Sequence, residues 1–245
     1  MKAIGIDIGG SRIKAAVVDT VEGAMLTKRQ RIDTPRPATP KAVIEACEEV
    51  VKPFGEITRI GVGFPGVVRD GTVLTAQNLH PEWIGFSLEE SLSLRLKRPV
   101  KALNDADAAG VAEIRFGAGA GVDGSVILLT IGTGLGSALF TDGNLVQNTE
   151  FGRMFFGRKR EAEAFVSETA KDRDDLSNEE WAERFEEYLA HLEALYWPKL
   201  IIVGGGGAKK FPEVKDLIKT RCELRHATSK NKAGIIGAAL WAAEA

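Results

Sequence analysis

The feature of this sequence that most restricts its fold is a short pattern that occurs twice. Residues 3–10 form an apolar, strand-like run that ends in two glycines, and residues 127–134 form a similar run that ends in Gly-Thr-Gly. In each copy an aspartate, Asp19 or Asp142, lies ten residues beyond the first glycine of the turn. A second apolar run follows each turn, which predicts a β-hairpin. We therefore expect two similar halves, each of which begins with a strand–turn–strand unit.

Between and after the two hairpins, apolar runs of strand length alternate with helical patterns. Ser177 and Glu180 form a capping-box pattern at the start of the longest expected helix. The charged run at 171–175 is expected to be a solvated loop. The other strand-like runs lie at 59–64, 100–103 and 200–203, and the other main helical patterns begin near residues 40, 87 and 106. Strands that alternate with helices indicate an α/β fold.

The composition and net charge of the chain limit the kinds of molecule that it can be expected to bind. A length of 245 residues allows one large domain or two small ones. The net charge is −2, from 32 basic and 34 acidic side chains, so there is no basic surplus for a nucleic-acid partner. No apolar run is long enough to span a membrane and no leader pattern is visible, so we expect a cytoplasmic protein without a membrane partner. Only two cysteines occur, far apart, and we expect no structural zinc.

The first glycine turn is a candidate phosphate site, with an ordinary hairpin turn as the alternative. Its glycines would let backbone N–H groups approach an anion closely. The Ser11 hydroxyl could donate a hydrogen bond, the basic side chains add charge, and Asp7 could hold a hydrated Mg²⁺ ion. The segment matches neither a Walker loop nor a dinucleotide-binding fingerprint, because a second strand follows it. The candidate residues are Asp7, Gly9, Gly10, Ser11, Arg12 and Lys14.

Two further glycine segments could contact the same anion. Gly132, Thr133 and Gly134 form the second turn, and two facing turns could grip a polyanion from both sides. Four consecutive glycines at 204–207 follow a strand and could let an adenosine or a phosphate chain lie against the backbone. Hairpin and strand-to-helix turns are the structural alternatives. The four are Gly204, Gly205, Gly206 and Gly207.

Polar side chains elsewhere suit a hydroxyl-bearing substrate. Asp105 follows a strand and opens a helix, where it could accept a hydroxyl proton during phosphoryl transfer or could simply cap the helix. Its neighbour Asn104 could orient the same substrate. Glu150 could bind sugar hydroxyls or be a surface carboxylate, and Asn78 could do the same or be a turn residue.

The order of these motifs resembles the ROK family of bacterial sugar kinases over nearly the whole chain. It is most similar to the compact polyphosphate/ATP glucokinases of that family, on the strength of segments 148–150, 196–198 and 233–239. The motifs are Asp7-Ile-Gly-Gly-Ser with Lys14, Pro65-Gly66, the run from Asn104 to Ala109, Gly132-Thr-Gly134, Glu150-x-Gly152 and Val203 with its four glycines.

The resemblance implies an actin-like, ribonuclease H-like two-domain fold of the hexokinase type, with a cleft between the domains. It implies a small N-terminal domain, 1–103, joined by a C-terminal helix at 232–245, and a larger C-terminal domain at 104–231. It also implies a homodimer and Mg²⁺-dependent phosphoryl transfer from polyphosphate, ATP or both to the 6-hydroxyl of glucose. Asp105 takes the position of the base, Asn104 and Glu150 take sugar-contact positions, and the glycine segments take the phosphate and nucleotide positions. Gly66 and Asn78 are further candidates for sugar binding.

Two residues depart from the family pattern. Arg153 stands where the family usually has a sugar-contacting histidine, and the apolar residues 154–156 follow it. Arginine only donates hydrogen bonds and carries a fixed charge, whereas neutral histidine donates and accepts. Arg12 stands where the similar branch more often has glycine. Arg153 leaves open a kinase for another hexose, such as mannose or N-acetylmannosamine, and a non-catalytic sugar or phosphate sensor.

Overall fold

The computed structural model describes residues 1–76, 79–156 and 160–244. The chain divides into two compact units, the first made of Met1–Ala112 and Lys232–Ala245 and the second of Glu113–Asn231. The division lies inside helix α3 (Asp105–Phe116) rather than at residue 104, and the first unit is slightly the longer of the two. The small alanines in the first turns of α3 belong to the core of the first unit, which explains why these turns group with it.

The first unit is built on a six-stranded mixed sheet. Its path is β3-β2-β1-β5-β8, and β4 pairs with β2 beside β3. β1 and β2 form the expected antiparallel hairpin, whereas β5 and β8 add parallel to β1. The strands are β1 (Lys2–Ile8), β2 (Arg12–Asp19), β3 (Ala24–Met25), β4 (Gln30–Asp33), β5 (Ile60–Phe64) and β8 (Val100–Asn104). A separate two-stranded sheet joins β6 (Val68–Arg69) to β7 (Thr72–Val73).

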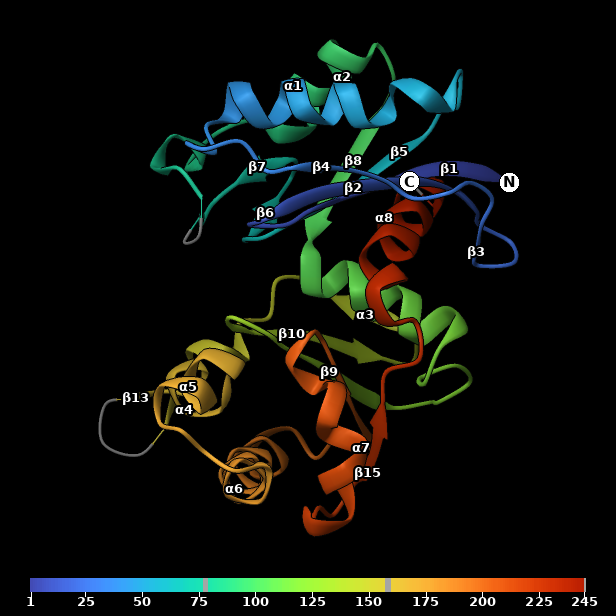
Figure 1. Cartoon of the computed structure of the whole chain (residues 1–245). Coiled ribbons are helices and arrows are strands. Elements are labelled where there is room, and N and C mark those ends of the chain that lie inside the picture. Colours follow the sequence, from blue (N-terminus) through green and yellow to red (C-terminus); the bar gives the residue numbers. More distant parts are fainter. Residues whose placement is uncertain (77–78, 157–159, 245) are drawn as a thin grey trace. The chain divides into compact units, whose positions relative to one another are not determined.

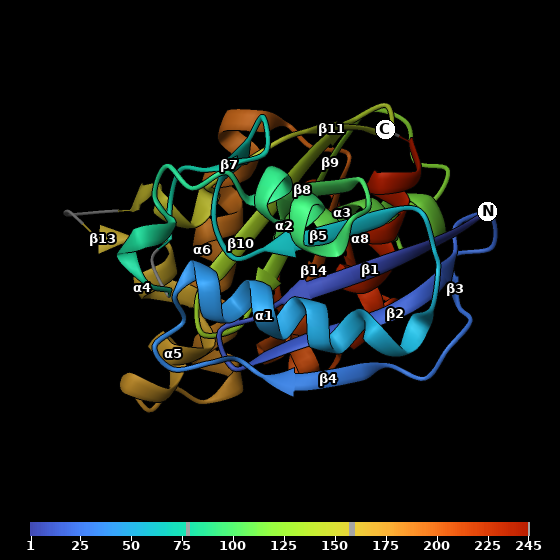
Figure 2. The ribbon, with the colours of Figure 1, turned by 90° about the horizontal axis from the view of Figure 1, so that it is seen from above.

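Helices cover both faces of this sheet. α1 (Pro40–Val51) and α2 (Leu88–Leu96) lie over one face, as Figures 1 and 2 show, and α8 (Ala233–Glu244) lies on the other. The period of two in β1 decides which residues meet which layer: Ile4 and Ile6 join the core under α1, and Ala3 joins the core with α8. Each buried aliphatic side chain contributes roughly 1.5–3 kcal/mol of transfer free energy.

Helix α8 packs with its backbone almost directly on the sheet. A β-carbon at Gly5 would lie 1.8 Å from the Ile235 carbonyl oxygen, and one at Gly61 would lie 1.7 Å from that of Ala238. No side chain fits at either distance, so the glycines are required for this approach. The predicted return of the C-terminal segment to the first unit therefore depends on glycines in β1 and β5.

The second unit repeats the arrangement with a five-stranded sheet of order β11-β10-β9-β14-β15. β9, β10 and β11 are antiparallel neighbours, and β14 and β15 add parallel to β9. The strands are β9 (Ser125–Ile131), β10 (Leu135–Thr141), β11 (Asn144–Val146), β14 (Leu200–Gly204) and β15 (Glu223–His226). β12 (Phe155–Phe156) and β13 (Arg160–Glu161) form a small separate pair.

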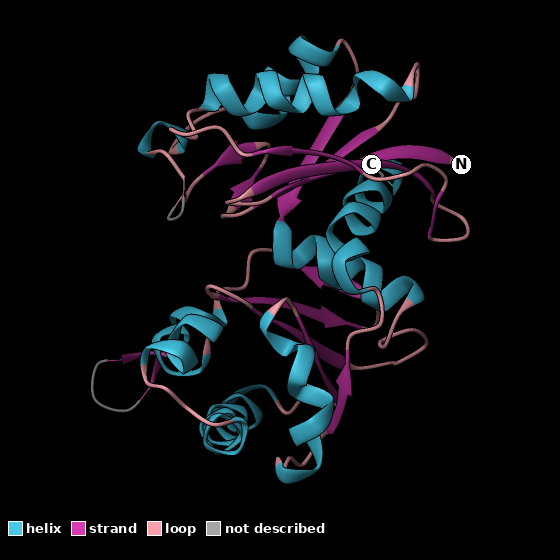
Figure 3. Ribbon diagram, viewed as in Figure 1, coloured by secondary structure: helices cyan, strands magenta, loops and turns pink. Residues whose placement is uncertain are grey.

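Helices α4, α6 and α7 share one buried cluster with this sheet, whereas α5 packs beside α4, and Figure 3 shows the four helices in cyan. They are α4 (Glu163–Val166), α5 (Glu168–Arg173), α6 (Asn178–Tyr196) and α7 (Phe211–Val214). The capping box of Ser177 and Glu180 is confirmed at the start of α6. The charged run at 171–175 is largely solvated as expected, but only its last two residues form a turn, because α5 continues to Arg173 with Ser167 as its N-cap.

The two sheets have the same strand order and the same directions, which confirms the two similar halves expected from the repeated hairpin. A pair of α/β units of this kind is the actin-like, two-domain fold class. No helix among the described residues is both long and apolar enough to cross a membrane.

Candidate active site

The predicted site residues of the first unit gather at the carboxyl end of its parallel strands. In the sheet register Asp7 lies beside Gly63, and Gly63 lies beside Leu103, so the ends of β1, β5 and β8 are level. The glycine turn follows β1, Gly66 follows β5, and Asp105 follows β8. Ligands of parallel α/β sheets bind at this edge, where the loops diverge.

The first glycine turn carries an ion pair at its base. Lys14 Nζ donates to Asp7 Oδ2 at 2.9 Å, across the hairpin, and both side chains remain partly exposed. The turn is fixed by Thr34, whose hydroxyl donates to the Gly9 carbonyl at 2.6 Å and whose backbone N–H donates to the Ser11 carbonyl at 3.0 Å. Gly10 and Ser11 are exposed. The turn therefore presents its tip to solvent from a rigid base.

Asn104, rather than Asp105, supplies the main cap of α3. Its side-chain oxygen accepts from the backbone N–H groups of Ala106 at 2.8 Å and Asp107 at 3.2 Å. Its amide nitrogen donates to the Gly66 carbonyl at 3.2 Å, and the side chain is buried. Asp105 accepts from the neighbouring Ala106 N–H at 2.8 Å and stays partly exposed. The carboxylate of Asp105 is thus placed at a helix N-terminus without being the sole cap.

The two remaining sugar-binding candidates of the first unit are Gly66 and Asn78. A β-carbon at Gly66 would lie 2.2 Å from the Thr75 carbonyl oxygen, so this glycine is required for packing, and its carbonyl is the acceptor for Asn104. Asn78 lies outside the described residues.

In the second unit the turn of Gly132, Thr133 and Gly134 is tied to the first residues of α5. The Glu168 N–H donates to the Gly132 carbonyl at 2.9 Å, and the Thr169 hydroxyl donates to the Thr133 carbonyl at 2.8 Å. Both bonds use carbonyl oxygens of the turn as acceptors. The turn is therefore anchored to α5 through its carbonyl groups.

Glu163 is a site residue that the sequence analysis did not identify. Its carboxylate accepts from the Leu135 N–H at 3.0 Å, and a β-carbon at Gly134 would lie 2.4 Å from it. Its negative charge also acts on Glu150. Glu163 and Leu135 are 28 residues apart in the chain, and no spacing pattern joins them. Glu163 therefore links the glycine turn to the segment that contains Glu150 only in the folded chain.

Glu150 lies in a turn that β10 holds in place. The buried Ser137 hydroxyl accepts from the Phe151 N–H at 2.9 Å and donates to the Thr149 carbonyl at 2.8 Å. Desolvation by the surrounding protein raises the pKa of Glu150 above its ordinary value. The charge of Arg153 lowers this pKa and that of Glu163 raises it further.

Arg153, the departure from the family pattern, is held by an acidic residue of this chain. Its guanidinium donates to Glu161 Oε2 at 3.2 Å and to Oε1 at 3.4 Å, and both side chains are partly exposed. Phe155, which follows on the same segment, is 69% exposed. Arg153 therefore places a fixed positive charge beside Glu150.

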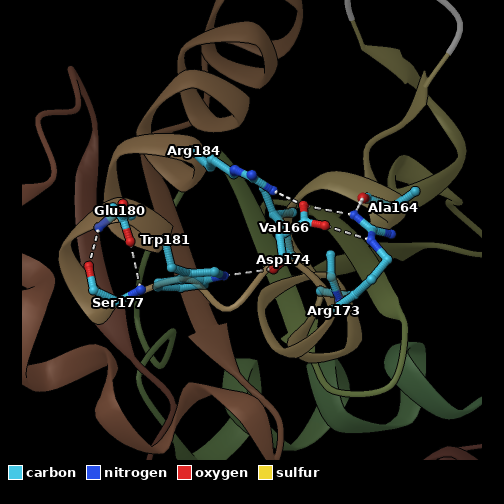
Figure 4. A network of polar contacts seen from close by, with 10 residues as sticks. Ala164, Val166, Arg173, Asp174, Ser177, Glu180, Trp181 and Arg184 are labelled. Carbon is cyan, nitrogen blue, oxygen red and sulfur yellow. Dashed lines mark hydrogen bonds and ion pairs between the residues drawn. The ribbon is translucent and has the colours of Figure 1, made fainter.

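A polar network behind α4 and α5 orients the segment that carries Glu163 (Figure 4). Asp174 accepts from Arg173 Nε at 2.8 Å and from Arg184 Nη1 at 2.6 Å, and Arg173 Nη2 also donates to the Ala164 carbonyl at 3.0 Å. The Trp181 indole donates to the Val166 carbonyl at 2.9 Å. These bonds join α4, α5 and the first turns of α6 into one block.

The four glycines at 204–207 do not serve one purpose. Gly205 has φ of +92° and lies against the Ile131 backbone, so it is required by the turn itself. Around Gly206, by contrast, no described atom beyond its chain neighbours lies within 4 Å of a β-carbon position. The same holds for Gly10 and Gly132, and none of these three has a left-handed φ. Local geometry therefore leaves Gly10, Gly132 and Gly206 without a packing role, which favours a role in approaching a ligand.

Comparison with known proteins finds relatives that are similar over nearly the whole chain. The polyphosphate glucokinase of Mycobacterium tuberculosis is 43% identical over 237 residues, which cover 96% of this chain and 89% of that protein. The inorganic polyphosphate/ATP-glucomannokinase of Arthrobacter sp. strain KM superposes with a TM-score of 0.93 at 42% identity, over 99% of this chain and 98% of the other. A ROK family glucokinase from Streptomyces griseus, solved with glucose and AMPPNP, superposes with a TM-score of 0.83 at 28% identity and full coverage of both chains.

The ROK family model matches residues 3–155, which include the first glycine turn, Asp105, the second glycine turn and Glu150. From this match and from the similarity over nearly its full length, the chain belongs to the ROK family.

Proposed function

We propose that this protein is a sugar kinase that transfers a phosphoryl group from polyphosphate, ATP or both to the 6-hydroxyl of glucose, with Asp105 as the general base. The observation that carries the proposal is the state of Asp105: its carboxylate is partly exposed at the start of α3, while Asn104 does most of the capping. The relatives named polyphosphate glucokinase and polyphosphate/ATP-glucomannokinase support the choice of donor and acceptor.

In the proposed reaction, the Asp105 carboxylate accepts the proton of the sugar 6-hydroxyl. The hydroxyl oxygen forms a bond to the terminal phosphorus of the donor, and the phosphoanhydride bond of that phosphorus breaks. The shortened donor leaves with the electron pair of the broken bond. Phosphoryl transfer depends mainly on positioning and on charge stabilisation, so a base and phosphate-binding groups are sufficient.

Two groups of residues are proposed to bind the donor. The first turn offers the backbone of Gly9 and Gly10, the Ser11 hydroxyl and the charge of Lys14. The second offers Gly132, Thr133 and Gly134, with Gly206 on the nucleotide side. The open space at Gly10, Gly132 and Gly206 supports this assignment, because a backbone without side chains lets phosphate oxygens approach its N–H groups. Both donors end in the same phosphoanhydride, so both suit the same turns.

Asp7 fits a magnesium ion that such a donor would bring. Mg²⁺ in phosphoryl-transfer sites is held by one or two carboxylates together with phosphate oxygens and water. Asp7 supplies one carboxylate beside the turn, with one oxygen paired to Lys14. Among the described residues no cluster of three or more His, Cys, Asp or Glu side chains is placed to hold a metal. When bound, Mg²⁺ offsets the charge of the phosphate chain. We propose no structural zinc, since the chain has only two cysteines, Cys47 and Cys222, and no Cys-x-x-Cys pair.

The groups proposed to form hydrogen bonds with the sugar are Glu150, Asn104, the Gly66 backbone and Asn78. Glu163 is added to these groups because its negative charge acts on Glu150 and raises the pKa of that residue. Arg153 favours a second candidate, a kinase for mannose or another hexose, because it replaces an acceptor-capable side chain by a donor-only one and is held in place by Glu161. The name of the Arthrobacter glucomannokinase supports mannose as this second acceptor.

We propose that the enzyme is a cytoplasmic homodimer with no membrane or nucleic-acid partner. The resemblance to the family supports the dimer. The balanced net charge of −2 supports the absence of a nucleic-acid partner.

A matrix of donors and sugars tests the function. Purified protein is assayed with polyphosphate and with ATP, each with glucose, mannose and N-acetylmannosamine, and Arg153→His is assayed in parallel. Mg²⁺-dependent formation of glucose 6-phosphate by the wild type supports the proposal. If Arg153→His gains glucose turnover relative to mannose, Arg153 sets the specificity. Sugar binding without transfer from either donor would contradict a kinase and leave a non-catalytic sensor.

A further inference from the structure

A row of basic side chains leads away from the first glycine turn on one face of the sheet. Arg12 and Lys14 are two residues apart on β2 and therefore point to the same face. In the antiparallel pairing of β2 with β4, Arg12 lies opposite Asp33 and Lys14 lies opposite Arg31. Directly opposed residues share a face, so Arg31 extends the row onto β4. Figure 2 shows β4 running beside β2 in the first unit.

The pairing of Lys14 with Arg31 is unfavourable by itself. Like charges that face each other across an antiparallel pair destabilise it. Lys14 is paired to Asp7 at 2.9 Å on its other side, and Arg12 is paired to Asp33 at 3.5 Å. The two carboxylates thus face three cations, and Arg31 is exposed. An anion placed over Lys14 and Arg31 would replace this repulsion by attraction.

The position of the row indicates which anion. It begins at Arg12, directly after Ser11 of the turn proposed to hold the transferred phosphate, and it continues to the exposed strand β4. A single phosphate at the turn would not extend to Arg31 on the neighbouring strand. A chain of linked phosphates would carry negative charge along the whole row.

We propose that Arg12, Lys14 and Arg31 form a subsite for the tail of a polyphosphate donor, with Arg31 as a residue that distinguishes long from short donors. The inference rests on the proposed kinase function and deepens it. Phosphates beyond the transferred group lie along β2 and β4, where the basic side chains release counterions from the polyanion on binding. The contribution of Arg31 grows with the length of the donor.

The test is equilibrium binding of inorganic tripolyphosphate and of long-chain polyphosphate to Arg31→Gln. The matched control is Arg69→Gln, which removes the same charge from an exposed position on β6 outside the row. For Arg31→Gln the dissociation constant of the long chain should rise about fivefold, and that of tripolyphosphate less than about twofold. For the same variant, the logarithm of the long-chain dissociation constant should depend less steeply on the logarithm of salt concentration, with a slope smaller by about one. Arg31→Lys keeps the charge and should bind the long chain almost as the wild type does.

Equal effects on both chain lengths, or no effect beyond that of Arg69→Gln, would overturn the subsite. The two proposals fail separately. If the wild type phosphorylates sugars but Arg31→Gln binds long polyphosphate normally, only the subsite is wrong. If Arg31 governs long-chain binding but no donor supports transfer to any sugar, the kinase function is wrong and the polyanion site remains.

Discussion

At the scale of single residues, the ionisation of Glu150 is set by groups around it rather than by its own chemistry. Desolvation and the charge of Glu163 raise its pKa, and Arg153 opposes them. An ionised carboxylate accepts hydrogen bonds from sugar hydroxyls at both oxygens, whereas a protonated carboxyl group is a donor at one of them. Arg153 thus extends the acidic range over which Glu150 remains an acceptor.

This balance predicts a change in pH dependence for Arg153→Gln. Loss of the positive charge raises the pKa of Glu150 further, so Glu150 takes up its proton at a higher pH. The acid limb of kcat/KM for the sugar should therefore move to higher pH, which steady-state assays across the acidic range would measure. Arg160→Gln removes a similar charge from β13, and it should leave the acid limb unchanged. An Arg153→Gln profile that coincides with the wild type would contradict this account.

At the scale of elements, short helices depend on polar contacts that local sequence does not display. The hairpin turns and the capping box of α6 were correctly predicted because each is a pattern of adjacent residues. Helix α5 was not, since it is only six residues long and has no apolar period. Asp174, just beyond it, binds Arg184 on the next helix, and this partner becomes a neighbour only in the folded chain (Figure 4).

Asp174→Asn should weaken the second unit in a pH-dependent manner. Hydrogen bonds from Arg173 and Arg184 hold the pKa of Asp174 well below its usual value of 3.8. A depressed folded-state pKa adds stability above the ordinary pKa, and this stability is lost as the pH falls. The variant should have a lower Tm than the wild type at neutral pH, and the difference should shrink at about pH 3 and below. Asp172→Asn, at an exposed position of α5, should match the wild type at both. A difference that did not depend on pH would contradict the ion-pair account.

At the scale of the whole molecule, both crossings of the chain between its units lie close to one carboxylate. Glu113 is the first residue of the second unit, and the chain leaves that unit again at Asn231. The side chain is 1% exposed and accepts from the Thr228 N–H at 3.1 Å and from the Ser229 N–H at 2.7 Å. It also accepts from the Ala118 N–H at 2.8 Å. Glu113 therefore joins α3 to the segment that leads into α8.

Glu113→Gln should lower the free energy of unfolding by roughly 3 kcal/mol, because a buried amide can replace only part of these charge-assisted bonds. Denaturant titration followed by circular dichroism measures the loss. Glu187→Gln, on the exposed face of α6, changes charge equally and should cost less than about 0.5 kcal/mol. Equal stability of the two variants would show that Glu113 does not hold the crossing segments.

The sequence was sufficient for the repeated architecture and for most of the candidate site, because the glycine turns and Asp105 lie at strand ends that hydrophobic runs mark. It was not sufficient for Glu163 or Glu113, whose partners are distant in the chain. It also did not assign the cap of α3 to Asn104, since adjacent Asn and Asp residues are both common N-caps.

The most direct test of the proposed kinase is the turnover of Asp105→Asn with glucose and the better donor. Asparagine keeps the shape of the side chain but cannot act as the base at neutral pH. The account predicts a fall in kcat of about 10²–10⁴-fold, with unchanged thermal stability. Asp123→Asn, at an exposed loop position, should keep wild-type turnover. Wild-type turnover in Asp105→Asn would contradict the central claim that this carboxylate accepts the hydroxyl proton.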